Sequence, residues 1–218
     1  MNEDIRYVMA MSCVLPAVTG VIQYNRIDRR FHPFIMMMVL DVIIESIYYI
    51  GLKFPVLGSI HHFTVNIYMF LNFWLFLYFA FINGYVSKTV RQVLLGAALF
   101  ICIINSVYNG SVFQFFYYLV CFVSTVMLVI SIDILSRQVM VLNQKLVNNP
   151  WFWISSFSII YNAFTLLVFA LYFFALANTP DGKAVAIIQH FVNLACYVFF
   201  AVGIARIPVK SREEAASP

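Results

Sequence analysis

Seven apolar stretches separated by short polar breaks run through the chain, and they constrain its fold more than any other feature. A bilayer core about 30 Å thick is crossed by an α-helix of roughly 20 apolar residues. Because 63% of the 218 residues are hydrophobic and only 10% are charged, the chain has little material for a soluble domain. The sequence therefore predicts an all-α, seven-transmembrane-helix bundle, with spans at residues 5–24, 34–50, 60–82, 93–107, 112–135, 151–176 and 184–207.

The flanks of these spans predict their length and direction. The fourth stretch is short, so we expect its helix to be thinly anchored or to extend into the flanking polar residues. Basic residues concentrate beside one set of span ends, with Arg26, Arg30 and Lys88 among them. Since cytoplasmic loops carry the excess of Lys and Arg, we expect the N-terminus outside and the C-terminus in the cytoplasm. Residues 1–207 then form one transmembrane domain, and residues 208–218 form a short cytoplasmic tail.

Polar residues within the spans have a spacing that suggests an internal repeat. A proline is followed by two polar residues at the same intervals in two spans: Pro33, Asp41 and Glu45 in the second, and Pro150, Ser158 and Asn162 in the sixth. A His-Phe pair followed by an asparagine occurs in the third and seventh spans, at His62 and His190, with one residue's difference in spacing. The pattern predicts two parallel three-helix repeats joined by the fourth helix, although such matches also arise by chance in apolar sequence.

Two acidic residues lie within the second span. Asp41 and Glu45 are four residues apart and share one helix face, and an ionised side chain at bilayer depth costs about 2.5 to 3.5 kcal/mol on insertion scales. This cost favours a ligand, ion or proton site. The alternative is a structural hydrogen bond to a neighbouring helix, with the carboxyl protonated. Asp133 and Arg137, by contrast, are expected to form an ordinary ion pair at the membrane boundary.

The depth of the polar residues predicts that they converge. Glu45 and Asn162 each lie twelve positions after a proline, or about 18 Å along the helix, and the polar residues of the third and seventh spans descend from outside to a similar layer. We therefore expect a polar pocket in the outer half, with Glu45 as its charge and His190 as a candidate partner. The alternative is that each residue joins neighbouring helices. The residues expected to bind a ligand are Asp41, Glu45, His62, Asn66, Tyr161, Asn162, His190 and Asn193.

Several classes of protein lack support in the sequence. The four cysteines all lie in apolar segments, which argues against a disulfide framework. No spacing typical of a metal site, a phosphate-binding loop or a nucleophile elbow is present, so the sequence predicts no cofactor and no metal. The expected partners are membrane lipid, a small-molecule ligand, a cytoplasmic signalling protein and a second copy of the chain, and no nucleic acid is expected.

Several short motifs resemble a known group of proteins. They are Leu15-Pro16-x3-Gly20, Glu45-Ser46, Asn66-Ile67-Tyr68, Asn149-Pro150-x-Phe152-Trp153-Ile154, Ile160-Tyr161 and His190-x2-Asn193. Together they resemble small seven-helix membrane proteins of Bacteroidetes, and this resemblance implies a bacterial inner membrane and a sensory role beside two-component signalling. Asn72 or a neighbour stands where that group often has a second glutamate. The layout is also similar to SWEET-type carriers, in which two three-helix units flank a single helix.

Three functions remain open at this point. The first is a receptor-like sensor that binds a small ligand and signals through a separate cytoplasmic protein. The second is a small-solute transporter of SWEET-like layout, with Asn66 and Asn193 at the substrate. The third is an intramembrane hydrolase or transferase that uses Glu45 with His190.

Overall fold

A computed structural model describes residues 11–53, 58–109, 115–141, 146–173 and 179–208, and these residues are helical without any β-strand. The C-terminal tail predicted at residues 208–218 lies outside them except for its first residue. The predicted all-α class is confirmed for the described residues. Their seven α-helices are α2 (Val14–Gln23), α3 (His32–Lys53), α4 (Gly58–Ile82), α5 (Lys88–Asn109), α6 (Tyr117–Val141), α7 (Pro150–Phe173) and α8 (Pro180–Ala205).

Five of these helices, α4 to α8, are long and apolar enough to cross a membrane. Helix α2 is described over a shorter apolar segment that begins with a 3-10 turn at Met11–Cys13. Helix α5 extends beyond the predicted fourth stretch, because Lys88 and Arg91 continue the helix at its polar start. The chain is therefore an all-helical protein with five helices suited to a multi-pass membrane protein.

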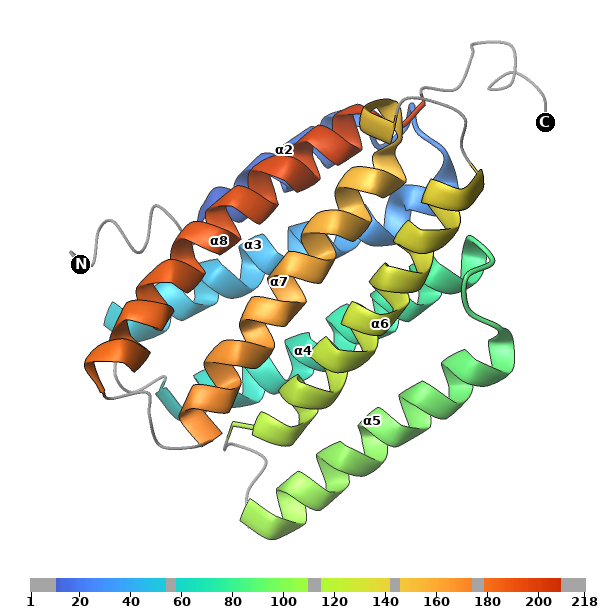
Figure 1. Ribbon diagram of the computed structural model, residues 1–218. Coiled ribbons are helices and arrows are strands. Elements are labelled where there is room, and N and C mark those ends of the chain that lie inside the picture. The colour runs from blue at the N-terminus through green and yellow to red at the C-terminus, as the bar shows by residue number, and fades with distance from the viewer. Residues whose placement is uncertain (1–10, 54–57, 110–114, 142–145, 174–178, 209–218) are drawn as a thin grey trace.

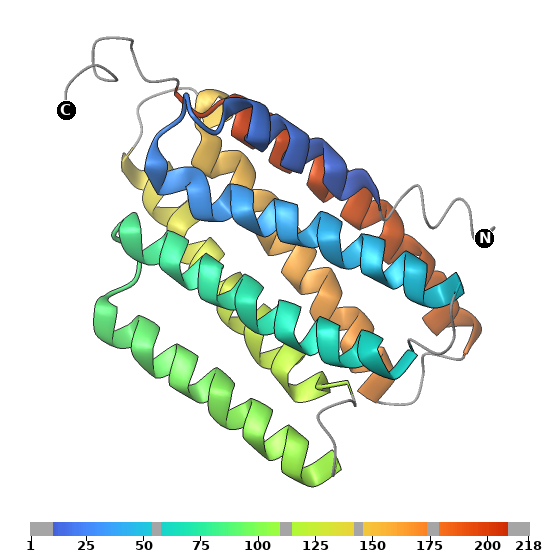
Figure 2. The same cartoon turned by 180° about the vertical axis from the view of Figure 1, so that it is seen from behind.

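The helices form two layers of three (Figures 1 and 2). One layer contains α2, α3 and α4, and the other contains α8, α7 and α6. Close packing runs from α2 to α3, α4, α6, α7 and α8 and back to α2, which makes a closed ring. Helix α5 lies outside this ring, and among the described helices it packs closely only against α4 and α6.

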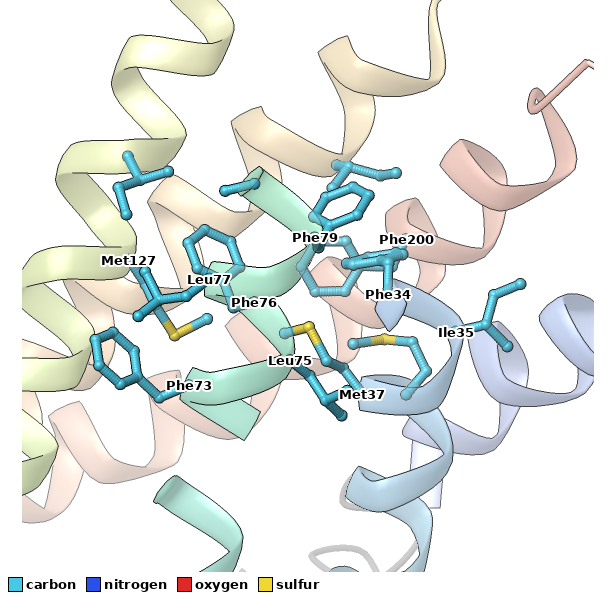
Figure 3. Close-up of a cluster of buried hydrophobic side chains, with 14 of the residues drawn as sticks. Phe34, Ile35, Met37, Phe73, Leu75, Phe76, Leu77, Phe79, Met127 and Phe200 are labelled. Atoms are coloured by element: carbon cyan, nitrogen blue, oxygen red, sulfur yellow. The ribbon is translucent and has the colours of Figure 1, made fainter. Parts of the chain in front are cut away.

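One end of the bundle is filled by aromatic side chains, which we call the aromatic end: Phe31, Phe34, Phe79, Trp151 and Phe200. The Phe79 ring is fully buried and stacks on Trp151, with ring centroids 4.9 Å apart. Phe34 lies between Phe79 and Phe200, at 5.6 and 5.5 Å. Figure 3 shows these three rings meeting where α3, α4 and α8 converge. Aromatic contacts of this kind add to the packing beyond the area they bury.

Two glycines bring helices close together near the aromatic end. A Cβ added at Gly20 of α2 would lie 2.7 Å from Ile35 Cγ2 of α3. A Cβ added at Gly203 of α8 would lie 3.2 Å from both Trp153 Cβ and Ile154 Cγ1 of α7. Small residues at such positions allow the close backbone approach that stabilises membrane helices.

Candidate functional site

A cavity of about 320 Å³ lies inside the ring of helices, and we call it the central cavity. The two middle helices, α3 and α7, are not among the closely packed pairs of described helices, which leaves room between the layers. Its walls come from five helices and from Phe115, two residues before α6. The lining residues are Asp41, Ile44, Glu45, Val65, Tyr68, Met69, Asn72, Phe115, Val120, Val123, Ser124, Met127, Tyr161, Asn162, Thr165, Val168, Phe169, Gln189, Asn193 and Tyr197.

The cavity is displaced from the aromatic end. Its lining residues come from the middle of α3 and α8, the first half and middle of α4, the first half of α6, and the second half of α7. The rings at the aromatic end come from the opposite ends of the same helices. Helices α4, α6 and α8 run toward the aromatic end and α3 and α7 run away from it, so the lining segments lie together between the middle of the bundle and its other end. The bundle is therefore hollow in one half and closed in the other.

Asp41 is held by a tyrosine hydroxyl group. Its side chain is only 5% exposed, and Tyr68 donates a hydrogen bond of 2.5 Å to its Oδ1 atom. Asn72 Nδ2 donates to the Tyr68 hydroxyl oxygen at 2.9 Å, one helical turn further along α4. The Tyr197 hydroxyl lies beside Asp41 and Tyr161. Asp41 thus joins α3 to α4 and faces α8.

Glu45 lies one turn beyond Asp41 on the same face of α3. It lines the cavity and has no hydrogen-bond or ion-pair partner among the described residues. A carboxyl group in such a place keeps its acceptor capacity for a molecule in the cavity. The two acidic residues therefore differ in role. Asp41 belongs to a hydrogen-bonded network, whereas the Glu45 carboxyl group has no hydrogen-bond partner among the described residues.

Asn162 forms the polar base of the cavity on α7. Its Nδ2 atom donates to the Ser158 carbonyl oxygen at 2.8 Å, and Ser158 Oγ accepts a bond of 2.9 Å from Ser131 of α6. These side chains are buried, with Asn162 only 2% exposed. The network closes the cavity on the side that leads toward the aromatic end.

Two amide oxygens at the cavity wall lack partners. Gln189 Nε2 donates to Asn193 Oδ1 at 2.8 Å, but Gln189 Oε1 is buried and accepts no hydrogen bond in the described part of the chain. Asn72 Oδ1 is buried and unpaired in the same way. Leaving a buried acceptor unpaired costs about 1 to 3 kcal/mol. Both atoms are thus suited to receive donors from a bound molecule.

Five of the eight predicted ligand-binding residues line the cavity: Asp41, Glu45, Tyr161, Asn162 and Asn193. They come from α3, α7 and α8, and the common layer predicted for Glu45, Asn162 and Asn193 agrees with where they lie. The structure brings these side chains together, and nothing in it shows what they bind.

The other three predicted residues are not among the lining residues. Asn66 is buried, and its Oδ1 atom accepts a hydrogen bond from the Phe116 backbone N–H at 3.1 Å, which ties α4 to the start of α6. His62 is exposed, and its ring lies at an edge of Phe115. His190 is half-buried on the face of α8 beside the lining stripe. Asn66 therefore has the role of a polar link between helices, which the sequence left open.

The predicted set of ligand-binding residues left out six polar side chains of the cavity: Tyr68, Asn72, Ser124, Thr165, Gln189 and Tyr197. The spacing of several of these residues along the sequence could have identified them as members of one helix face. Tyr68 and Asn72 are four apart, and so are Gln189, Asn193 and Tyr197, which marks one helix face each. The tyrosines were easily taken for apolar aromatic residues, although a buried Tyr hydroxyl usually has a hydrogen-bond partner.

The charge of the cavity is one-sided. It contains the carboxyl groups of Asp41 and Glu45, and no Lys, Arg or His is among its described lining residues. Within the described residues, no group of three or more His, Cys, Asp or Glu side chains could hold a metal ion.

Two further predictions concern residues away from the cavity wall. The four cysteines are free. Asp133 forms the predicted ion pair with Arg137, with 2.9 Å between Oδ2 and the guanidinium nitrogen, at the surface.

Comparison of the chain with protein-family models, with curated proteins and with solved structures finds no match. Function is therefore inferred from the cavity and its chemistry alone.

Proposed function

We propose that this chain is a receptor-like membrane protein that binds a small molecule in the central cavity. In this proposal the chain crosses a bacterial inner membrane seven times, with its N-terminus outside and its C-terminus in the cytoplasm. The cavity then lies in the outer half of the bundle, and the aromatic end faces the cytoplasm. A separate cytoplasmic protein reads the bound state.

One observation carries the proposal: the cavity has the size of a small-ligand pocket, and its mostly apolar wall contains several polar groups. A volume of about 320 Å³ is at the lower end of the range of roughly 300 to 1,000 Å³ for ligand pockets, which suits a small metabolite. Polar groups deep in a membrane protein are costly and are usually retained for function. Glu45 and the unpaired oxygens of Asn72 and Gln189 are such groups, and packing alone does not account for them.

The arrangement also offers a route from ligand to output. A molecule in the cavity touches α3, α4, α6, α7 and α8 together, so it stabilises one set of helix positions over others. These helices continue into the closely packed aromatic end. A change in their relative positions is therefore expected to reach the cytoplasmic boundary, where the partner binds.

Transport is the second candidate, and the helix arrangement supports it. The packing order around the ring is unchanged when α2 is exchanged with α6, α3 with α7 and α4 with α8, with α5 left outside. This is the arrangement expected of two parallel three-helix repeats joined by one helix. A carrier would need the aromatic end to open, whereas a sensor would not. The third hypothesis, an enzyme that uses Glu45 with His190, lacks support because His190 does not line the cavity.

Thiol labelling tests the proposal. In a variant without the four native cysteines, Thr165→Cys places a thiol at the cavity wall. We expect it to react with a water-soluble maleimide added outside intact cells. Two matched controls should not react: Ala80→Cys, fully buried near the aromatic end, and Ile103→Cys, 60% exposed on the apolar face of α5. An unreactive Thr165→Cys in a correctly inserted protein would show that the cavity is filled or closed to water, and would overturn the proposal.

Flux measurements separate the two candidates. Uptake of a bound solute into proteoliposomes would favour transport, and binding without uptake would favour sensing. Asn193→Ala is the informative variant, because Asn193 lines the cavity, whereas Asn66→Ala should act through the α4–α6 contact.

A further inference from the structure

We propose that the ligand of the central cavity is a small organic cation: a primary ammonium group carried on an apolar or aromatic body. This inference rests on the proposed function and names the chemical class of the molecule that the cavity takes. Three independent features of the wall support it.

The first feature is the unbalanced charge. Asp41 and Glu45 line one cavity, and none of its described lining residues is basic. A buried carboxylate is stable only with a partner of opposite charge or after taking up a proton. A cationic ligand supplies that partner, whereas an anionic ligand would add a third like charge in the same space.

The second feature is the excess of acceptors. Glu45, Asn72 Oδ1 and Gln189 Oε1 have no donor among the described residues, and all belong to the cavity wall. An ammonium group has three N–H donors and no acceptor, so it matches this set. A quaternary ammonium would leave the same oxygens unpaired. The hydrogen-bond pattern therefore favours a primary amine.

The third feature is the aromatic wall. Tyr68, Tyr161 and Tyr197 surround the carboxyl groups, and Phe115 stacks on Phe169 with ring centroids 5.6 Å apart. Aromatic faces attract cations and also pack against an apolar or aromatic body. The cavity of about 320 Å³ is much larger than a bare metal ion, so an organic molecule fits it better.

The two carboxyl groups are assigned different tasks. Asp41 already accepts a hydrogen bond from the Tyr68 hydroxyl group, which orients it, and the Tyr197 hydroxyl lies beside it. Glu45 is open and one turn nearer the end of α3. We therefore assign the direct ammonium contact to Glu45 and a supporting negative charge to Asp41.

Charge-matched thiol reagents test the inference directly, because they probe the sign of the cavity's charge and need no identified ligand. At Thr165→Cys, we expect 2-aminoethyl methanethiosulfonate to react faster than the 2-sulfonatoethyl reagent, by about tenfold or more after correction for an exposed surface cysteine. Glu45→Gln should bring this ratio close to the surface value. Asp133→Asn is the matched control, because it removes a surface carboxylate that is 43% exposed and paired with Arg137, and it should leave the ratio unchanged.

Matched small probes give a second readout. We expect 2-phenylethylamine to protect Thr165→Cys and to raise the melting temperature of the purified protein, and 2-phenylethanol and 3-phenylpropanoate to do neither. Equal rates for the two reagents, or a faster anionic reagent, would overturn the cation inference and leave a ligand cavity standing. If neither reagent reacts at Thr165→Cys, the proposed function itself fails, so the two failures are distinguishable.

Discussion

The two halves of the bundle are made from the same helices but are packed in opposite ways. At the aromatic end, Phe34, Phe79 and Phe200 fill the space between α3, α4 and α8, and glycines bring neighbouring helices together. In the other half the same helices enclose the central cavity, which is lined with carboxyl, amide and hydroxyl groups.

The difference shows how a membrane bundle can be both stable and hollow. Without a strong hydrophobic force between helices, packing must provide the stability, and here the aromatic end provides most of it. The polar half is then free to contain groups that are unfavourable in the empty state. Substitutions at the aromatic end should therefore lower stability, whereas some in the cavity should raise it.

The largest effect is expected from Phe79→Ala. Removing this fully buried ring from its contacts with Phe34 and Trp151 should lower the free energy of unfolding by about 3 to 5 kcal/mol. Unfolding in detergent micelles, followed by tryptophan fluorescence, measures it. Phe100→Ala is the control, since Phe100 is 63% exposed on α5 and should change little. Equal losses for the two variants would contradict the assignment of stability to the aromatic end.

A smaller loss is expected from Gly20→Ala. The new Cβ would lie 2.7 Å from Ile35 Cγ2, so α2 and α3 must move apart, at a cost of about 1 to 3 kcal/mol. Gly96→Ala is a matched control within a helix, because nothing lies within 4 Å of its added Cβ. It should be neutral or stabilising by up to about 1 kcal/mol. Thermal unfolding of both variants under one condition decides the point, and a stabilised Gly20→Ala would refute close packing there.

Opposite signs are expected for the two acidic residues. Asp41→Leu leaves the Tyr68 hydroxyl group without its acceptor and should cost about 1 to 2 kcal/mol. Glu45→Leu removes an unpartnered carboxyl group and should stabilise the empty protein by about 1 kcal/mol while abolishing amine binding. Melting temperatures with and without 2-phenylethylamine report both effects. A destabilised Glu45→Leu would mean that Glu45 is structural.

The smallest effect is expected at the base of the cavity. Ser131 Oγ donates to Ser158 Oγ at 2.9 Å between α6 and α7. A double-mutant cycle with Ser131→Ala and Ser158→Ala should give a coupling of about 0.6 kcal/mol, the average for such bonds in membranes. A coupling near zero would mean that the two hydroxyl groups bond elsewhere in solution.

The fold was largely predictable because hydropathy and helix rise fix where a helix lies along the membrane normal. The second span was expected at residues 34–50, and α3 runs over His32–Lys53. The difference in bounds is largest for α6, which was expected at residues 112–135 and runs over Tyr117–Val141. Helix α5 begins at Lys88 and not at residue 93, because Lys88 and Arg91 are polar yet still helical at the boundary. Charge and hydropathy alone do not indicate where a helix stops once it leaves the hydrocarbon.

The cavity was only partly predictable from the sequence. The position of a residue in a helix predicts its depth more reliably than it predicts the direction in which its side chain points. Glu45, Asn162 and Asn193 were expected in one layer, and all three line the cavity. On α4 the lining face passes through Tyr68 and Asn72 instead of Asn66, which bonds the Phe116 backbone. A polar residue at the right depth can either line a pocket or form a hydrogen bond to a neighbouring segment. For Asn66, only the packing of α4 on α6 decides between the two.

Helix α5 is the only described α-helix outside the ring, and only 11% of its span is buried. It carries the chain from the end where α4 stops back to the end where α6 begins, so that α6 runs in the same direction as α2. Without this return, the second set of three helices would be inverted relative to the first, and Glu45 and Asn162 would be carried to opposite faces of the membrane. Helix α5 thus contributes direction more than packing, and outside its few buried positions, such as Ala98 and Asn105, its sequence can vary as long as the helix remains long and apolar.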